Sequence, residues 1–302
     1  MPSRRRAMGS ADRIGPMAIQ SAAFPRQDKT LSSLVGFVRS VGRGTLRGWA
    51  FRGETSKTIA VPVQDEVTIE VRWPGGHFSV HGSPWDLEAF AVGHLISEGY
   101  VPSYASIRFV TVHPRHADHV RINVGLVGRK RTAGSRRDNV LWGSDPRPQP
   151  LPSCDSASRI RAGDLLALAD ALHREEKTLR AAGPLHWAAL FDSSSHRLLL
   201  ASDLSRHNAV DKVLGRALAS ELAVPGHILY SSGRVGEELA AKAIRVGAAA
   251  LATRSVPFRS AVDLARRHGL LLLGKLRPGS FWVYAGKSRL ARAGRRRGGP
   301  SA

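Results

Sequence analysis

The sequence predicts an α/β protein in which helices cover the faces of a mixed sheet. Between residues 186 and 285, short apolar runs of strand length alternate with segments whose apolar residues recur every three or four positions. That order is typical of strand-helix-strand units and of a sheet with parallel pairs. Residues 67–124 show both patterns with more strands than helices, which indicates a smaller α+β part. With 302 residues, 42% of them hydrophobic, the chain can bury one large or two small cores.

Composition divides the chain into five segments. Residues 1–50 are basic and irregular and are expected to form a disordered tail. Residues 60–127 form the α+β subdomain, and residues 128–160 are basic and Pro-rich, as in a mobile loop that joins two halves. Residues 161–286 form the α/β domain, and residues 287–302 are a second basic tail.

The first subdomain begins with alternating residues at 67–71 and 78–80, which predict two antiparallel strands joined by a Pro-Gly turn. A helix follows, for which Ser83 is the expected cap, with Pro84 in the first helical position and Asp86 completing an S-x-x-D box. Its predicted apolar face includes His94, which we interpret as a core histidine, and two more strands are expected at 107–112 and 120–124.

The second domain opens with a helix at 164–180 and ends with two strands joined by a Pro-Gly turn. A further helix is expected after residue 201, where Ser205 or Asp203 can cap it. The other elements are strands at 186–191, 197–201, 228–231, 248–253, 270–273 and 281–285, and helices at 237–246 and 261–268.

Three loops would meet at the carboxyl ends of these strands, where such sheets bind ligands. The first is the start of the helix after residue 201, where exposed N–H groups favour an anion, although spacing alone favours a capped helix with solvated polar residues. The second is the Ser-Gly turn at 230–237, and the third is the Pro-Gly turn at 274–280. Each loop carries a basic residue, so together they indicate an anionic or nucleotide ligand.

The net charge of +21 is concentrated at the ends of the chain, because residues 1–50 carry +7 and residues 286–302 carry +6. Neither zinc-finger spacing nor an RNA-binding aromatic motif is present, so specific nucleic-acid recognition has little support. The single cysteine, Cys154, excludes an internal disulfide. No apolar run reaches the roughly 18 residues of a membrane span, and no secretory signal is evident, so we expect a soluble cytoplasmic protein.

Several motifs, taken in order, give the chain a resemblance to the FdhD family of formate dehydrogenase accessory sulfurtransferases over roughly residues 60–290. The most distinctive run is R-H-N-A-x-D-K, which begins at Arg206. The others are Gly82-Ser83-Pro84-Trp85-Asp86-Leu87-Glu88, Leu95-Ile96-Ser97-Glu98-Gly99, Leu185-His186-Trp187-Ala188, Ser231-Ser232-Gly233-Arg234 and the segment from Leu270 to Tyr284.

The resemblance implies a cytosolic homodimer whose C-terminal half has a cytidine-deaminase-like fold. It implies persulfide sulfur received from a cysteine desulfurase and passed to the molybdenum bis(molybdopterin guanine dinucleotide) cofactor of formate dehydrogenase, with no metal bound by the protein directly. The cofactor-binding segment would be Lys275, Leu276, Arg277, Pro278, Gly279 and Ser280. The other two loops would complete the pocket with Arg206, His207, Asn208, Asp211, Lys212, Ser232, Gly233 and Arg234.

The chain departs from the family at the cysteines. Members carry C-G-x-C-G, and its first cysteine holds the persulfide, but here residues 134–139 read Gly-Ser-Arg-Arg-Asp-Asn. Ser202 and Ser205 also replace a Glu and a Gly of the family pattern. Cys154, the only thiol, is therefore the only candidate persulfide carrier.

Three functions stay open at this level. The chain delivers sulfur to, or binds, the molybdenum cofactor during formate dehydrogenase maturation; it is a cofactor- or partner-binding paralogue that has lost persulfide transfer; or its basic segments bind nucleic acid or an acidic partner.

Overall fold

A computed structural model describes residues 43–52, 55–127, 150–154, 159–181 and 185–291. Most of the two predicted tails and of the predicted basic loop lies outside these residues. The described residues form three sheets and five α-helices. The predicted α/β class is confirmed.

The larger sheet has the strand order β12-β11-β10-β9-β7-β8. β9, β10 and β11 are parallel to one another, while β7, β8 and β12 run antiparallel to their neighbours. The sheet is therefore mixed, as the alternation of apolar runs predicted. Its strands are β7 (His186–Phe191), β8 (Arg197–Asp203), β9 (Ile228–Ser231), β10 (Ala250–Thr253), β11 (Leu271–Arg277) and β12 (Ser280–Ala285).

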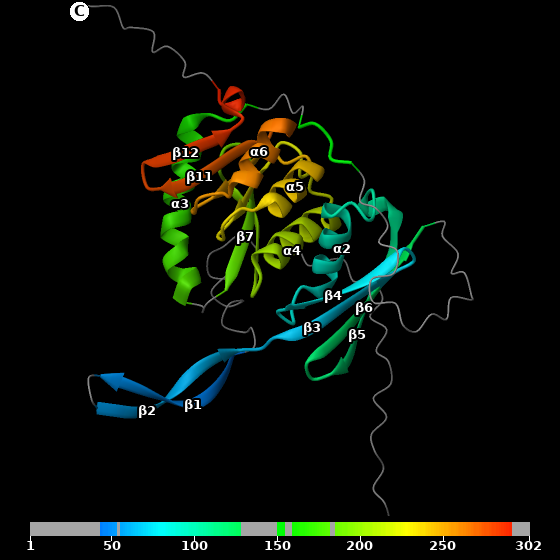
Figure 1. The fold of residues 1–302 in the computed structure, drawn as a ribbon, viewed down its shortest axis with the longest axis vertical. Helices are drawn as coiled ribbons and strands as arrows, with labels where there is room; N and C mark the ends of the chain where they lie inside the picture. The colour runs from blue at the N-terminus through cyan, green and yellow to red at the C-terminus, as the bar shows by residue number, and fades with distance from the viewer. Residues whose placement is uncertain (1–42, 53–54, 128–149, 155–158, 182–184, 292–302) are drawn as a thin grey trace, which may run out of the picture.

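Helices cover both faces of this sheet (Figure 1). Helix α3 (Ala162–Ala181) packs on one face, where Leu165, Leu168 and Tyr230 share a buried cluster. The opposite face is covered by α4 (Arg206–Ala219), α5 (Glu237–Arg245) and α6 (Arg259–His268). Successive strand residues point to opposite faces, so β9 sends Leu229 toward α4 and Tyr230 toward α3.

The smaller sheet has the order β4-β3-β6-β5, and α2 (Leu87–Ser97) packs on one of its faces. Its core joins Ile69 and Ile122 of the sheet to Phe90 and Leu95 of the helix. The strands are β3 (Val67–Trp73), β4 (Gly76–Gly82), β5 (Ile107–His116) and β6 (His119–Leu126), and the short 3₁₀ helices are η1 (Tyr104–Ser106) and η2 (Lys287–Arg289).

The predicted start of the first helix is wrong. Helix α2 begins at Leu87, and Asp86 precedes it with a left-handed backbone (φ 54°) and no capping hydrogen bond from its side chain. Ser83 does not cap, because its hydroxyl accepts a hydrogen bond from the Leu204 backbone N–H at 3.2 Å. The Asp86 carboxylate lies 3.3 Å from the Arg216 guanidinium. Both side chains of the S-x-x-D pattern therefore join α2 to the larger sheet and to α4.

Helices α2 and α4 cross at two glycines, and this crossing joins the two sheets into one body. A Cβ atom on Gly93 of α2 would lie 1.8 Å from the Asp211 carbonyl oxygen. A Cβ atom on Gly215 of α4 would likewise lie 1.8 Å from the Ala89 carbonyl oxygen. Neither helix can carry a side chain there, since the backbones are in direct contact.

A two-stranded antiparallel ribbon precedes the smaller sheet and projects from it (Figure 1). It pairs β1 (Arg43–Arg52) with β2 (Thr55–Gln64) along their whole length. The predicted end of the disordered tail at residue 50 is therefore wrong, because residues 43–50 form a strand. The run RGTLRGWAFR has no clean alternation of apolar and polar residues, and its hydrogen bonds come from β2.

No helix in the described ranges combines the length and the apolar character that crossing a bilayer requires.

Candidate functional site

The carboxyl ends of three parallel strands meet at one edge of the larger sheet. Ser231 ends β9 beside Thr253 of β10, and the neighbouring β11 ends at Arg277. The segments that follow these strands are tied together, because Lys275 N donates to Ser255 O at 2.9 Å and Phe258 N donates to Val235 O at 2.9 Å. Open α/β sheets bind ligands beyond such strand ends. We call this region the carboxyl edge.

The start of α4 reaches the same edge. Ser205 caps the helix, as predicted, with its hydroxyl accepting from the His207 N–H at 3.3 Å. Arg206 lies directly against Gly233, where a Cβ atom would come within 2.7 Å of the Arg206 Cδ. Two of the three predicted loops are thus in contact, and glycine is required at residue 233 for that contact.

The loop after β9 is fixed by hydrogen bonds to two strands. Ser232 N donates to Trp187 O at 2.9 Å, and the Ser232 hydroxyl accepts from Trp187 N at 3.0 Å. Thr253 Oγ1 donates to Gly233 O at 2.8 Å. The loop therefore holds Arg234 in an exposed position, with its guanidinium 5.7 Å from the centre of the Phe258 ring.

Two buried polar atoms at the carboxyl edge are without a hydrogen-bond partner in the described part of the protein. Among the residues that the structure describes, Ser231 Oγ and Arg206 Nε are buried and have no hydrogen-bond partner in the protein. Buried polar groups are normally paired, because burying them unpaired costs about 1–3 kcal/mol each. A hydroxyl and a guanidinium in this state are suited to contact an anionic ligand.

Two histidines at this edge are affected by the charge of Arg206. Burial, and next the positive charge of Arg206, lower the pKa of His207 below its ordinary 6.5, against the opposing effect of Glu238. The same two causes lower the pKa of His186. Both imidazoles are therefore mainly neutral at pH 7, and arginine supplies the positive charge there.

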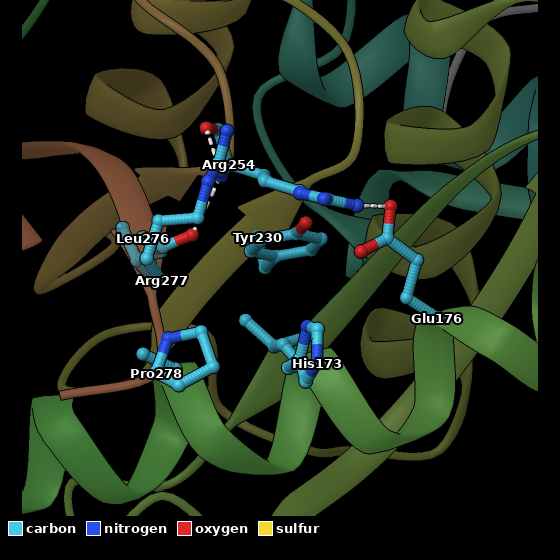
Figure 2. Close-up of a pocket in the computed structure, with 9 residues that line it drawn as sticks. His173, Glu176, Tyr230, Arg254, Leu276, Arg277 and Pro278 are labelled. Atoms are coloured by element: carbon cyan, nitrogen blue, oxygen red, sulfur yellow. Dashed lines mark hydrogen bonds and ion pairs between the residues drawn. The ribbon is translucent and has the colours of Figure 1, made fainter. Parts of the chain in front are cut away.

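A pocket opens beside this edge between α3 and β11. Its lining comprises Ala169, Leu172, His173, Glu176, Tyr230, Arg254, Leu276, Arg277 and Pro278. Figure 2 shows the Tyr230 ring in the middle, with Arg254 on one side and His173 and Pro278 on the other. Arg254 forms an ion pair with Glu176 across this space. The pocket thus has an apolar and aromatic lining with one charged rim.

The predicted segment from Lys275 to Ser280 comprises the end of β11, the turn at Pro278 and Gly279 and the first residue of β12, and it forms part of the pocket. Leu276 is buried, and Arg277 and Pro278 line the pocket beside it. Arg277 Nη1 donates to the carbonyl oxygens of Arg254 and Leu276 at 2.9 and 2.8 Å. Gly279 has φ 71°, which favours glycine, and its N–H donates to Asp170 of α3 at 3.3 Å, while Ser280 is exposed.

The remaining residues predicted on α4 are buried away from the pocket. Lys212 Nζ lies 2.7 Å from Asp203 Oδ2 and donates to Ser83 O at 3.3 Å. Burial lowers the pKa of Lys212, and Asp203 opposes this shift.

The side chains of Asn208 and Asp211 likewise face α2 and β4. Asn208 Nδ2 donates to His81 O at 2.9 Å. Asp211 accepts from Lys242 at 2.8 Å and lies 2.9 Å from His94 Nδ1, so His94 is held by a hydrogen bond to Asp211 and packs against Phe78. Lys212, Asn208 and Asp211 therefore support the position of Arg206 and His207 from within.

Three polar pocket residues were not predicted from the sequence, His173, Glu176 and Arg254, whereas Tyr230 begins the predicted loop at 230–237. Arg254 directly follows a strand that was predicted, so the rule that located the other loops could have found it. His173 and Glu176 lie on the face of α3 that borders the pocket, for which the sequence gives no local signal. In the described part of the chain, no three His, Cys, Asp or Glu side chains are grouped as a metal site requires.

A family model described as the FdhD/NarQ family matches residues 64–291, which include both sheets and the carboxyl edge. The chain belongs to this family. The Sulfur carrier protein FdhD of Streptomyces coelicolor is 33% identical over 257 residues, covering 75% of this chain and 88% of that protein. The protein of the same name from Geobacillus kaustophilus is 29% identical, covering 76% and 92%.

Two further FdhD/NarQ comparisons differ in extent. The Sulfur carrier protein FdhD of Streptomyces avermitilis is 40% identical over 168 residues, covering 55% of this chain and 56% of that protein. A crystal structure from Desulfotalea psychrophila, described as that of a formate dehydrogenase accessory protein, superposes with a TM-score of 0.63 at 23% identity. It covers 82% of this chain and 99% of that one, and it supports the fold.

The only thiol of this FdhD/NarQ chain lies near the amino end of β11, opposite the carboxyl edge of the larger sheet. Cys154 N donates to His268 O at 2.8 Å, just before β11 begins, whereas Arg277 ends β11 at the pocket. A strand of this length spans about 20 Å, at roughly 3.3 Å a residue. Cys154 is therefore not brought together with the pocket, and residues 134–139, where the family cysteines were expected, lie outside the described residues.

Proposed function

We propose that this chain is an accessory protein of formate dehydrogenase maturation that binds the guanine dinucleotide portion of the molybdenum cofactor at the carboxyl edge. The observation that carries the proposal is that Arg206, Gly233 and the unpaired Ser231 hydroxyl lie at the same carboxyl edge as Arg254 and Arg277, which line the pocket. The names of the curated relatives and of the solved structure support the link to sulfur carriage and to formate dehydrogenase.

The chemistry of the edge suits a nucleotide with a pyrophosphate. Arginine is preferred for phosphate because its planar guanidinium can donate two parallel hydrogen bonds. The N–H groups at the start of α4 add partial positive charge beside Arg206. The exposed side chains of His173 and Pro278, beside the buried Tyr230 and Leu276, supply the wall against which a planar ring system packs.

Guanosine diphosphate is the probe for this pocket. Titration by isothermal calorimetry should detect binding to the full-length chain, and Arg277→Ala or Arg206→Ala should weaken it about tenfold or more, as the loss of a charge-assisted hydrogen bond implies. Arg161→Ala is the matched control, since Arg161 is exposed and pairs with Asp164 far from the pocket. Absence of nucleotide binding, or an equal loss of affinity in the Arg161→Ala control, would refute the proposal.

Sulfur carriage through Cys154 is the second candidate function, favoured by the names of the relatives. In it, the Cys154 thiolate attacks the outer sulfur of a cysteine desulfurase persulfide, so that a new S–S bond forms on Cys154, the S–S bond of the desulfurase breaks and the desulfurase cysteine leaves as a thiolate. Incubation with a desulfurase and cysteine should then add the mass of one sulfur atom, and Cys154→Ser should abolish the addition. An unmodified Cys154 rejects this function and leaves cofactor binding in place. We also infer a homodimer, which sedimentation of the full-length chain tests.

A further inference from the structure

Large apolar side chains are exposed at two places on the molecule. The described residues include six such side chains, and three of them, Val256, Phe258 and Trp282, belong to the corner of the larger sheet next to the pocket. Trp282 is 58% exposed, Phe258 46% and Val256 43%. Single exposed apolar residues need no explanation, but a contiguous group marks an interaction surface.

These three side chains belong to two segments that touch each other. Trp282 pairs with Gly274 across the β11–β12 ladder. A Cβ atom on Gly274 would lie 2.7 Å from the Tyr284 ring and 3.1 Å from Pro257 Cδ, so the strand and the 254–258 segment touch there. We call the surface of Val256, Phe258 and Trp282 the aromatic corner.

The aromatic corner is positively charged. Lys275 Nζ lies 5.6 Å from the centre of the Trp282 ring, and the Arg234 guanidinium lies 5.7 Å from that of Phe258. Arg254 and Arg259 flank the corner along the chain. Four cations, Arg234, Arg254, Arg259 and Lys275, therefore lie over these rings or flank them, and they outnumber the two exposed carboxylates, Glu237 and Glu238, that follow Gly236 beside the Phe258 ring.

We propose that the aromatic corner docks an acidic protein surface that presents an apolar side chain, and that this surface belongs to the enzyme that receives the cofactor. This inference rests on the proposed function, because the corner adjoins the pocket through Arg254 and Lys275. Trp and Arg dominate the binding energy of protein interfaces, where they pack in the dry centre of the contact. The charge calls for carboxylates on the partner, since opposite potentials speed and orient association.

A single-stranded nucleic acid fits this corner less well. Such ligands stack their bases on free aromatic faces. Here one face of each ring is occupied by a cation of the chain itself, and the aliphatic side chain of Val256 completes the surface.

The test measures binding of the full-length chain to a purified, cofactor-free formate dehydrogenase catalytic subunit by biolayer interferometry. Trp282→Ala should weaken binding about tenfold or more, as expected for an interface anchor. Arg259→Glu should weaken binding and reduce its dependence on salt concentration. The matched controls are Phe109→Ala and Arg108→Glu on β5, which also remove an exposed apolar side chain and an exposed cation but belong to the smaller sheet.

Guanosine diphosphate titrations of the same variants separate this proposal from the proposed function. If Trp282→Ala binds both the nucleotide and the enzyme as the unaltered chain does, docking at the corner is rejected and the pocket stands. If the unaltered chain binds the nucleotide but not the enzyme, docking at the corner is rejected and the proposed nucleotide pocket stands. Self-association that Trp282→Ala abolishes, or binding of a single-stranded oligonucleotide in place of the enzyme, would also overturn it. Loss of enzyme binding with unchanged nucleotide affinity supports it and shows that the variant is folded.

Discussion

Lys212 and Asp203 form an ion pair sealed from solvent, with Nζ 2.7 Å from Oδ2 and both side chains 0% exposed. Asp203 also accepts hydrogen bonds from Ser83 N at 3.1 Å and from Ser205 N at 2.9 Å. One carboxylate therefore connects the loop before α2, the start of α4 and the end of β8. Because Arg206 follows this junction directly, the pair determines where the end of α4 that carries Arg206 lies.

Removing the Asp203 carboxylate should therefore be costly. Asp203→Ala leaves the Lys212 ammonium buried without its counter-charge, which typically costs about 3–5 kcal/mol of unfolding free energy. Urea denaturation at pH 7 measures this loss of unfolding free energy. Asp164→Ala, which breaks the exposed Arg161–Asp164 pair, is the control and should cost less than about 1 kcal/mol. Equal costs for the two variants would show that burial does not govern the Asp203 pair.

The crossing of α2 and α4 makes a second prediction. Gly93→Ala and Gly215→Ala would each place a Cβ atom 1.8 Å from a backbone carbonyl oxygen of the other helix. Neither backbone can move without separating the helices. Overpacking a core typically costs about 1–3 kcal/mol of unfolding free energy, and a backbone contact costs more, so each variant should be strongly destabilised or fail to fold. Gly163→Ala, on α3, is the control, because its new Cβ atom would have no atom within 4 Å. Its thermal unfolding temperature should be unchanged or slightly raised. A folded Gly93→Ala protein of unaltered stability would refute the close crossing.

Asp211 predicts a specific dependence of stability on pH. Burial alone would raise its pKa, but the Lys242 charge and the His94 hydrogen bond outweigh burial and lower the pKa from 3.8 to about 2. The unfolded chain thus binds this proton more readily than the folded one. The stabilisation, about 2 kcal/mol, is present above pH 4 and is lost as the pH falls toward 2.

Asp211→Asn tests this dependence. The variant should be less stable at pH 7 and should lose less stability than the unaltered chain between pH 4 and pH 2. Urea midpoints across that range measure the difference, and parallel curves for the two proteins would contradict the assignment.

Local signals in the sequence predicted the features that local chemistry decides. Ser205 caps α4 as predicted, because the cap involves only the hydroxyl and an N–H two residues away. The same logic failed at Ser83, whose hydroxyl is bound by Leu204, 121 residues further along the chain. An S-x-x-D pattern cannot reveal that a distant strand end uses its side chains.

The candidate site shows the same division. The alternation of strands and helices correctly placed Gly233 and Arg277 at one edge, because parallel strands bring their carboxyl ends together. It could not separate Arg206, which lies against Gly233, from Lys212, which is buried. Both are polar residues near a helix start, and only the packing of α2 on α4 distinguishes them. Glu176 was missed for the converse reason, since its partner Arg254 belongs to another element.

The pairing of Arg254 with Glu176 makes the last prediction, which rests on nucleotide binding at the pocket. Their ion pair spans the pocket beside Tyr230, so a phosphate that recruits Arg254 must compete with the Glu176 carboxylate. Glu176→Gln removes the competing charge and should strengthen guanosine diphosphate binding about three- to tenfold, whereas Arg254→Ala should weaken it by about tenfold or more. Arg174→Ala changes an exposed cation on the same helix and should leave affinity within twofold, at roughly the level expected of distant surface charges. Calorimetric titration at fixed ionic strength distinguishes these outcomes, and weaker binding by Glu176→Gln would mean that the carboxylate holds the ligand or the pocket itself.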